Sequence, residues 1–309
     1  MSDTPTCAVV TGASGFIGSA LVRHLRAGGW EVVTVDRRSS LDAEPPTRQV
    51  DVAQEGALAG LLDDRTVVFH MAASADVAAS VANPRHDFDN TFRGVFEVLE
   101  AARHAGSRVV FPSTASIFDS SNTLPLSERA FPRPTSPYAA GKLGGEAYCH
   151  AYHRSYGLDV RIARLFSVYG VGMFRFAIHD IVRKIQENHE EVSIFGDGNQ
   201  VRDYLFIEDA VRGLTMVGFD GSAGEEYNVA SGNPVRLLDL TRTIAEIMGY
   251  PNIRIRPTGK SFAGDTARWY ADISKVRALG FEPSIDLRAG LERTIAWLLT
   301  RPIPKVHAL

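Results

Sequence analysis

The sequence predicts an α/β fold, in which a doubly wound parallel sheet is followed by a smaller mixed α/β lobe. Two observations predict it. In the first half of the chain, short apolar runs alternate with longer amphipathic stretches, which is typical of right-handed βαβ units with helices on both faces of a sheet. After about Ser167 this alternation ends, Gly and Pro become frequent and the apolar runs shorten. The second part is therefore expected to form a lobe of its own rather than further strands of the same sheet.

The elements of the first half follow one another as strand and helix. Six apolar runs have the length and composition of strands, namely Cys7–Thr11, Glu31–Asp36, Arg48–Val52, Val67–Met71, Arg108–Pro112 and Asp159–Phe166. Helical periodicity lies between them, near Gly15–Ala27, Gln54–Leu62, Asp87–Ala105 and Pro137–Tyr156. Gly28 and Gly29 provide the expected stop after the first of these helices.

The elements of the second half are shorter and more mixed. The expected strands are Val192–Phe195, Glu226–Val229 and Ile253–Arg256, and helices are expected near Phe176–Asn188, Leu237–Met248 and Leu287–Leu299. The sequence contains no flexible linker, so we expect the two parts to pack directly on each other. The first part would comprise residues 1–166 with parts of about 205–232, and the second 167–204 with about 233–309.

Composition and charge limit the classes of function. The 309 residues carry a net charge of −3, which argues against a nucleic-acid partner held by bulk electrostatics. Apolar runs fall short of the roughly 18 residues that a membrane helix needs, and the polar start at Met1–Thr6 lacks a signal-peptide pattern. Cys7 and Cys149 have no metal-ligand spacing. We therefore expect a cytoplasmic protein with no metal site and no membrane or nucleic-acid partner.

A glycine cluster lies where the first strand meets the first helix. Gly12, Gly15 and Gly18 would permit a tight turn, let backbone N–H groups approach a pyrophosphate and bring the helix close to the strand. The positive end of the helix dipole would then face the phosphates. A plain turn would use the same glycines. The context favours dinucleotide binding, because Asp36 ends the second strand, where a carboxylate accepts hydrogen bonds from ribose hydroxyls and repels a 2′-phosphate. Asp36 thus favours NAD over NADP, whereas the neighbouring Arg37 and Arg38 weaken this preference.

Tyr138 and Lys142 are four residues apart in an expected helix, so their side chains share one face of it. An ammonium near a phenol lowers the pKa of the phenol towards neutrality, which makes the phenol a proton acceptor for a substrate hydroxyl. A surface tyrosine beside a solvated lysine is the alternative interpretation of the same pair.

These features, taken with others in the same order, resemble the extended short-chain dehydrogenase/reductase family and its nucleotide-sugar epimerase and dehydratase branch. The matching segments are Thr11–Gly18, Asp36, Asp51-Val52, His70–Ala73, Asn90, Ser113-Thr114, Tyr138–Lys142, Arg164–Gly170, Gly196–Gly198, Arg202–Tyr204 and Tyr227–Val229. They span nearly the whole chain. The resemblance implies a Rossmann-type sheet that binds NAD and a smaller lobe that binds a nucleotide-diphosphate sugar.

The resemblance also implies roles for the matched positions. Tyr138 would be the catalytic acid and base, Lys142 would tune it and hold the nicotinamide ribose, and Thr114 would hydrogen-bond the reacting hydroxyl. Asn90 would support the active-site helix or the cofactor. The implied cofactor-binding positions are Gly12, Gly15, Phe16, Ile17, Gly18, Asp36, Asp51, Val52, Met71, Ala72, Ala73, Asn90, Ser113, Tyr138, Lys142 and Phe166. The implied substrate-binding positions are Thr114, Ser116, Ser167, Arg175, Arg202 and Asp265.

The residues after Thr114 bear on the type of reaction. A 4,6-dehydratase of this branch needs a carboxylate to remove the C5 proton and an acid to expel the C6 hydroxyl, but Ala115 and Ser116 occupy those positions. A 4-epimerase needs only the Tyr, the Lys, the Thr and bound NAD, and it passes through a transient 4-keto sugar. We therefore expect a 4-epimerase. A 4-ketoreductase that uses NADH or NADPH remains an alternative, and a non-catalytic NAD-binding sensor or scaffold is a further one.

The second lobe departs from the family pattern in three places. Ser167 replaces a usual Asn, Val171 replaces a frequent Pro, and Phe262 stands where a second diphosphate-binding Arg is common. The small hydroxyl of Ser167 is compatible with a UDP-glucuronate-type substrate, which is therefore considered together with UDP-glucose and UDP-N-acetylglucosamine. Arg175 would then meet a carboxylate at C6, or it is a solvated loop residue.

The resemblance also bears on assembly. The helices near Asp87–Ala105 and Pro137–Tyr156 would pair with their counterparts in a homodimer, as is usual in this family. Their apolar faces could instead all be internal core.

Overall fold

The computed structural model describes residues 7–38, 46–260 and 266–301 of the chain. A seven-stranded sheet forms its larger body. Its strands are β1 (Cys7–Thr11), β2 (Glu31–Asp36), β3 (Arg48–Gln49), β4 (Thr66–His70), β5 (Arg108–Thr114), β6 (Val160–Leu165) and β10 (Glu226–Val229). They lie in the order β10-β6-β5-β4-β1-β2-β3, and neighbouring strands pair in parallel. The expected doubly wound α/β fold of Rossmann type is confirmed.

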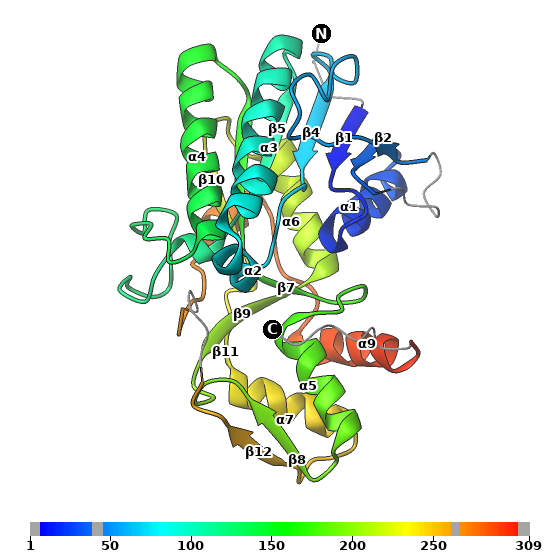
Figure 1. Cartoon of the computed structure of the whole chain (residues 1–309), viewed down its shortest axis with the longest axis vertical. Helices are drawn as coiled ribbons and strands as arrows, with labels where there is room; N and C mark the ends of the chain where they lie inside the picture. Colours follow the sequence, from blue (N-terminus) through cyan, green and yellow to red (C-terminus); the bar gives the residue numbers. More distant parts are fainter. Residues whose placement is uncertain (1–6, 39–45, 261–265, 302–309) are drawn as a thin grey trace.

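Helices cover both faces of this sheet (Figure 1). Helices α1 (Phe16–Ala27) and α6 (Ile207–Asp220) pack on each other over one face, and α3 (Pro84–Ala105) and α4 (Pro137–Tyr156) pack on each other over the opposite face. Alternate strand residues supply the two cores, so that Val67 and Phe69 of β4 face one layer and Val68 faces the other. The central strands β4 and β6 are thus buried on both sides, as is typical of a parallel sheet, whereas β3 at the edge is exposed.

Local chemistry sets the ends of α3 and α4, the two helices that carry the candidate site. Both begin with a proline in their first turn after a polar cap. The Asn83 side chain accepts from the N–H of His86 at 3.1 Å, and the Ser136 hydroxyl accepts from the N–H of Ala139 at 3.2 Å. Both end at a glycine in the left-handed region, Gly106 at φ 73° and Gly157 at φ 70°.

The smaller lobe lies at the other end of the molecule (Figure 1). It contains a three-stranded sheet in the order β11 (Pro234–Arg236), β9 (Val201–Phe206) and β7 (Ser167–Tyr169). Strands β8 (Glu191–Ile194) and β12 (Arg254–Pro257) form a separate parallel pair. Helices α5 (Phe176–Glu187), α7 (Leu237–Ile247) and α9 (Leu287–Leu299) pack together beside them. None of the helices in the described residues is long and apolar enough to cross a membrane.

Some expected elements differ from the structure. The helix expected near Gln54–Leu62 is wrong, because this segment is a series of turns in which Gly56 and Gly60 adopt φ of 70° and 71°. The strand expected over Arg48–Val52 is reduced to β3. Helices α2 (Val77–Ala82), α6 and α8 (Ser274–Arg277) were not expected from the sequence.

Candidate functional site

The glycine turn packs closely against the end of β4. Gly12 has a φ of 65°, and a Cβ atom placed on it would lie 2.6 Å from the backbone nitrogen of Ala72. A Cβ on Gly18 would collide with the carbonyl oxygen of Gly12. The first turn of α1, with Phe16 and Ile17, therefore packs directly on the turn at the carboxyl end of β1, with Gly15 as its N-cap. This cradle has the shape that a pyrophosphate at a helix N-terminus requires.

Asp36 lies beside this turn, at the end of β2. Its carboxylate accepts hydrogen bonds from the N–H of Ser14 at 3.0 Å and from the N–H of Arg38 at 2.9 Å. These two bonds fix its direction and leave lone pairs for the hydroxyls of a ribose. The guanidinium of Arg37 points elsewhere and donates to the side chain of Asn90. The geometry around Asp36 therefore fits an unphosphorylated ribose.

A pocket of about 330 Å³ adjoins Arg37. It brings Asp51 and Asn90 together, with Ala53, Gln54, His86, Asp89 and Arg93 completing its lining. The amide of Asn90 also donates to the carbonyl of His86 at 2.6 Å, so Asn90 lies at the rim of this pocket. The next residue, Thr91, is fully buried and packs on α4 instead, 3.3 Å from where a Cβ of Gly141 would lie. Contact with the helix of Tyr138 is thus made by Thr91 rather than by Asn90.

The segment Met71–Ala73 follows β4 and is tied to β1. The Thr11 hydroxyl accepts from the N–H of Ala72 at 3.2 Å and lies 2.9 Å from Nδ1 of His70. Ser113, at the end of β5, is buried, and its hydroxyl has no hydrogen-bond partner among the described residues. A buried hydroxyl with unused bonding capacity beside this segment fits a bound polar ligand. Val52 and Phe166, two further expected cofactor positions, are buried apolar side chains.

Thr114, Tyr138 and Lys142 are brought together. Thr114 ends β5 and caps a short 3-10 turn, Ala115–Ile117, by accepting from the N–H of Ser116 at 3.1 Å. Its hydroxyl also lies 3.2 Å from that of Ser116 and is hydrogen-bonded to Tyr138. One turn further along α4, the ammonium of Lys142 is buried and donates to the carbonyl of Pro112 at 2.8 Å.

The electrostatics of this pair differ from what its spacing predicts. Burial raises the pKa of Tyr138 to about 12, and the charge of Asp87 raises it too, against the lowering effect of Thr114 and Arg175. Burial lowers the pKa of Lys142 to about 8. The expected lowering of the phenol pKa by the ammonium is therefore not the dominant effect here, because loss of hydration outweighs it.

Ser167 and Arg202, two of the residues expected to meet the substrate, come from the smaller lobe. The guanidinium of Arg202 lies 4.1 Å from the ring centre of Trp269 and donates to the carbonyl of Ala267 at 3.1 Å. The Trp269 indole N–H in turn donates to the Ser167 hydroxyl at 3.4 Å. Ser167 and Arg202 are thus linked through Trp269. No sequence motif indicated a role for this tryptophan. Asp265 and Phe262 lie outside the described residues.

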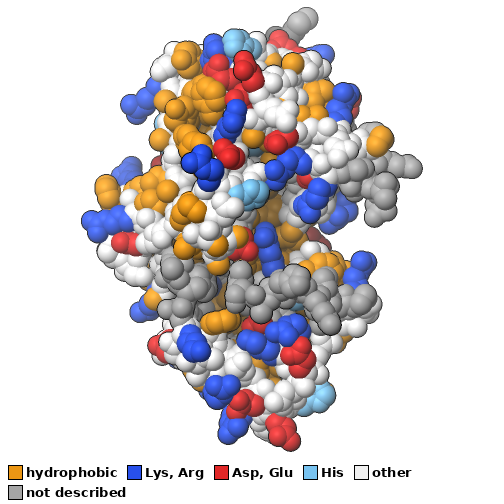
Figure 2. All heavy atoms as spheres, viewed as in Figure 1, with side chains coloured by type: hydrophobic (Ala, Val, Ile, Leu, Met, Phe, Trp, Pro, Cys, Tyr) orange, Lys and Arg blue, Asp and Glu red, His pale blue; other side chains and the backbone are white. Residues whose placement is uncertain are grey.

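Arg175 approaches the catalytic group from α5. It occupies the N-cap of this helix, and its charge lowers the pKa of Tyr138. Phe176, the next residue, has a φ of 69°, which is a strained conformation for a non-glycine residue. The guanidinium of Arg175 lies 4.7 Å from its ring centre. Figure 2 shows that this face of the molecule is hollowed between the larger body and the smaller lobe, with basic and hydrophobic side chains in the hollow.

The sequence analysis missed two residues near the catalytic pair, Asp87 and Thr91. Both are buried on the side of α3 that meets α4. Their four-residue spacing within an expected helix was the available signal, because it places two polar side chains on a face that is otherwise apolar.

Comparisons with known proteins agree with this geometry. Residues 8–230 match the model of the NAD dependent epimerase/dehydratase family. A UDP-glucose 4-epimerase of Mycolicibacterium smegmatis is 33% identical over 306 residues, which cover 93% of this chain and 96% of that protein. A dTDP-glucose 4,6-dehydratase of Actinoplanes sp. is 32% identical over 313 residues, which cover 94% and 96%.

A solved structure has the same fold over almost its whole length. It is a UDP-N-acetylglucosamine 4-epimerase from Methanobrevibacter ruminantium in complex with UDP-N-acetylmuramic acid. The TM-score is 0.87 at 28% identity, over 96% of this chain and 99% of that chain. Relatives of both reaction types, epimerases and dehydratases, are thus about equally similar to this chain.

Proposed function

The chain belongs to the NAD dependent epimerase/dehydratase family, and we propose that within it the chain is a 4-epimerase of a nucleotide-diphosphate sugar. The observation that carries the proposal is the turn after Thr114. Elimination of water needs a carboxylate and an acid beside the reacting hydroxyl, but this turn presents Ala115, which is buried, and the hydroxyl of Ser116. The turn therefore supports a reaction that needs proton transfer at C4 alone.

The cofactor NAD fits the residues of the larger body. The glycine cradle at Gly12 and Gly18 would hold the pyrophosphate, Asp36 the adenosine ribose, and Lys142 the nicotinamide ribose. When bound, NAD would supply the hydride acceptor and donor for the reaction at C4 of the sugar. Burial raises the pKa of Tyr138 to about 12, so the phenol would first have to release its own proton to solvent, a step that the positive charge of bound NAD would favour. The phenolate would then take the proton of the C4 hydroxyl as the 4-keto sugar forms and return it after the sugar has turned over. Thr114 would orient that hydroxyl.

The substrate would lie between this body and the smaller lobe. Arg202, stacked on Trp269, would bind the diphosphate, because a guanidinium pairs with phosphate oxygens through several N–H groups. The sugars we propose are of the UDP-glucose, UDP-N-acetylglucosamine or UDP-glucuronate type. The charge of Arg175 near Tyr138, together with the small hydroxyl of Ser167, supports a C6 carboxylate as in UDP-glucuronate.

The test is to incubate the protein with each of these three UDP-sugars without added NAD and to follow the anomeric protons by NMR. We expect the C4 epimer of one sugar to accumulate with no net change in NAD. Reduction of a 4-keto sugar at the expense of NADH or NADPH, without epimer formation, would instead identify a ketoreductase. A 4-keto-6-deoxy product from a dTDP- or UDP-sugar would identify a dehydratase. Either result would overturn the proposal.

We further propose that the chain forms a two-fold dimer through α3 and α4. Phe88, Phe96, Tyr148 and Tyr156 are exposed on these helices, and the rings of Phe96 and Tyr148 lie 6.0 Å apart, edge to face. An apolar patch of this kind on two adjacent helices is typical of an interface.

Sedimentation equilibrium tests this dimer. The parent should sediment as a dimer and Phe96→Asp as a monomer, because a buried unpaired carboxylate would oppose association. The matched control is Phe131→Asp, which changes a phenylalanine that is exposed elsewhere on the surface and should leave the dimer intact. A monomeric parent would contradict the proposal.

A further inference from the structure

Asp87 is a buried carboxylate next to the catalytic helix. It lies in the first turn of α3, where the positive end of the helix dipole favours a negative charge, and only 2% of it is exposed. Its Oδ1 accepts from the Thr91 hydroxyl at 3.4 Å, and Ser74 provides a second hydrogen bond. Its Oδ2 lies 3.9 Å from where a Cβ of Gly141 would be, which places the carboxylate against α4 between Tyr138 and Lys142.

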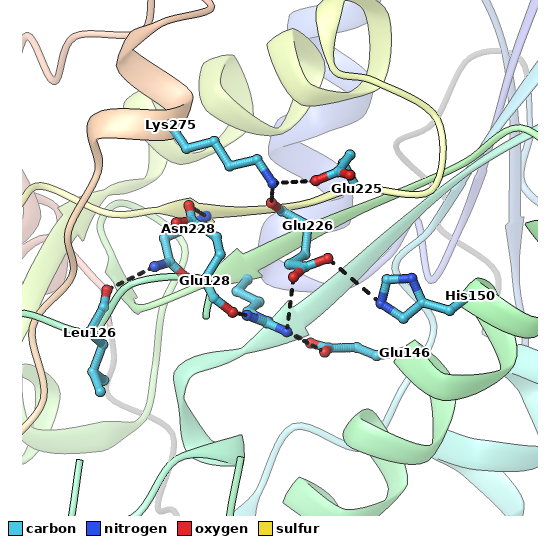
Figure 3. Close-up of polar contacts among 9 residues, drawn as sticks. Leu126, Glu128, Glu146, His150, Glu225, Glu226, Asn228 and Lys275 are labelled. Carbon is cyan, nitrogen blue, oxygen red and sulfur yellow. Dashed lines mark hydrogen bonds and ion pairs between the residues drawn. The ribbon is translucent and has the colours of Figure 1, made fainter. Parts of the chain in front are cut away.

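The other charged groups packed around Lys142 already have partners. On α4, Glu146 forms a bidentate ion pair with Arg164, which donates two hydrogen bonds at 3.0 and 2.8 Å. Figure 3 shows Glu146 within this network, which continues to Glu226, His150 and Lys275. The carboxylate of Glu146 is therefore hydrogen-bonded to a guanidinium, although its charge, like that of Asp87, raises the pKa of Lys142.

The other neighbouring side chains do not balance the charge of the ammonium either. From β4, His70 is bonded to Thr11, and burial lowers its pKa to about 3, so it is neutral. From α4, the thiol of Cys149 is kept protonated because burial raises its pKa. Arg175, from α5, adds positive charge near Tyr138. Asp87 is left as the acidic group that faces the pair from α3.

From this arrangement we propose that Asp87 is the counter-charge of the Tyr138–Lys142 pair, a positioning residue that holds the proton on Lys142. Its negative charge raises the pKa of both side chains. Without it, the lowering of the Lys142 pKa by burial would be opposed less, and the ammonium would lose its proton at a lower pH. A neutral amine would hold a ribose hydroxyl and the Pro112 carbonyl less strongly, since charge-assisted hydrogen bonds are the stronger ones. The consequence for turnover rests on the proposed function, whereas the protonation of Lys142 does not.

The experiment is therefore an NMR titration that needs no sugar. The chain has five lysines, so the ε-methylene signals of the folded, 13C-labelled protein can be resolved and that of Lys142 assigned by its loss in Lys142→Met. The parent should titrate near pH 8. Asp87→Asn keeps the size and polarity of the side chain but removes its charge, and we expect the midpoint to fall by about one pH unit.

The matched control is Glu97→Gln, which removes a carboxylate further along α3 and should leave the midpoint unchanged. An unchanged midpoint in a folded Asp87→Asn protein would overturn the proposal.

A second measurement uses the parent alone, in case this variant does not fold. The Lys142 signal should show an additional inflection in the acid range, where Asp87 takes up its proton at a pKa raised by burial. A Lys142 signal with no inflection in the acid range would also overturn the proposal. If the midpoint falls but no UDP-sugar is converted, the proposed function fails and the role of Asp87 stands.

Discussion

Tyr138→Phe should lower kcat by about 10³-fold, because the phenol is the group that we propose to exchange a proton with the C4 hydroxyl. The substitution keeps the ring and removes one hydroxyl, whose hydrogen bond to Thr114 is worth about 1 kcal/mol. The fold and the affinity for NAD should therefore be nearly unchanged. The measurement is kcat with whichever UDP-sugar the parent converts, together with NAD binding by titration calorimetry.

Tyr250→Phe is the matched control, since Tyr250 lies in the smaller lobe with its ring stacked on His189, 4.3 Å between centres. It should retain the parental kcat. A Tyr138→Phe protein with parental kcat would mean that another group transfers the proton. Equal loss of kcat and of NAD affinity would mean that the phenol serves binding rather than proton transfer.

Local sequence patterns predicted the catalytic helix and the glycine turn because the required geometry is itself local. The four-residue spacing of Tyr138 and Lys142 places them on one helix face whatever else surrounds the helix. The close contacts of Gly12 and Gly18 likewise arise within one strand, turn and helix. The parallel sheet followed from the alternation of elements, since crossover connections leave few other topologies.

The segment Gln54–Leu62 shows where local patterns fail. Its apolar residues have helical spacing. Gly56 and Gly60, however, adopt left-handed backbone conformations, which interrupt a right-handed helix. Leu58 is buried nevertheless, so the apolar periodicity reflected burial and not helix formation. Periodicity alone does not distinguish the two in so short a stretch.

The rest of the site depends on contacts between distant parts of the chain. Trp269 joins Ser167 and Arg202 only because the loop that carries it returns to β9. Asp87 likewise faces Lys142 only once α3 and α4 have packed. The protonation of the pair follows from this burial, which the spacing of two residues does not reveal.

Lys142→Met should make the cofactor-free protein more stable at neutral pH. Lowering the pKa of this amine from 10.5 to about 8 corresponds to a cost of roughly 3 kcal/mol for the buried ammonium below pH 8. Methionine has a similar length and carries no charge. Part of the gain is offset, because Asp87 loses its partner and the Pro112 carbonyl loses a donor. We expect a net gain of about 2 kcal/mol in the free energy of unfolding at pH 7.

The stability difference between Lys142→Met and the parent should depend on pH. A lysine whose pKa is lowered on folding binds its proton more weakly in the folded state, so the cost is full below pH 8 and vanishes as pH rises to 10.5. Urea unfolding of both proteins at a series of pH values should therefore give free energies of unfolding that converge as the pH rises.

Lys184→Met, at a lysine that is partly exposed and paired with Asp180, is the control and should show no gain. A Lys142→Met protein less stable than the parent at pH 7 would mean that the ammonium contributes to folding. The predicted gain, combined with lost turnover, would identify Lys142 as a residue kept for chemistry at the expense of stability.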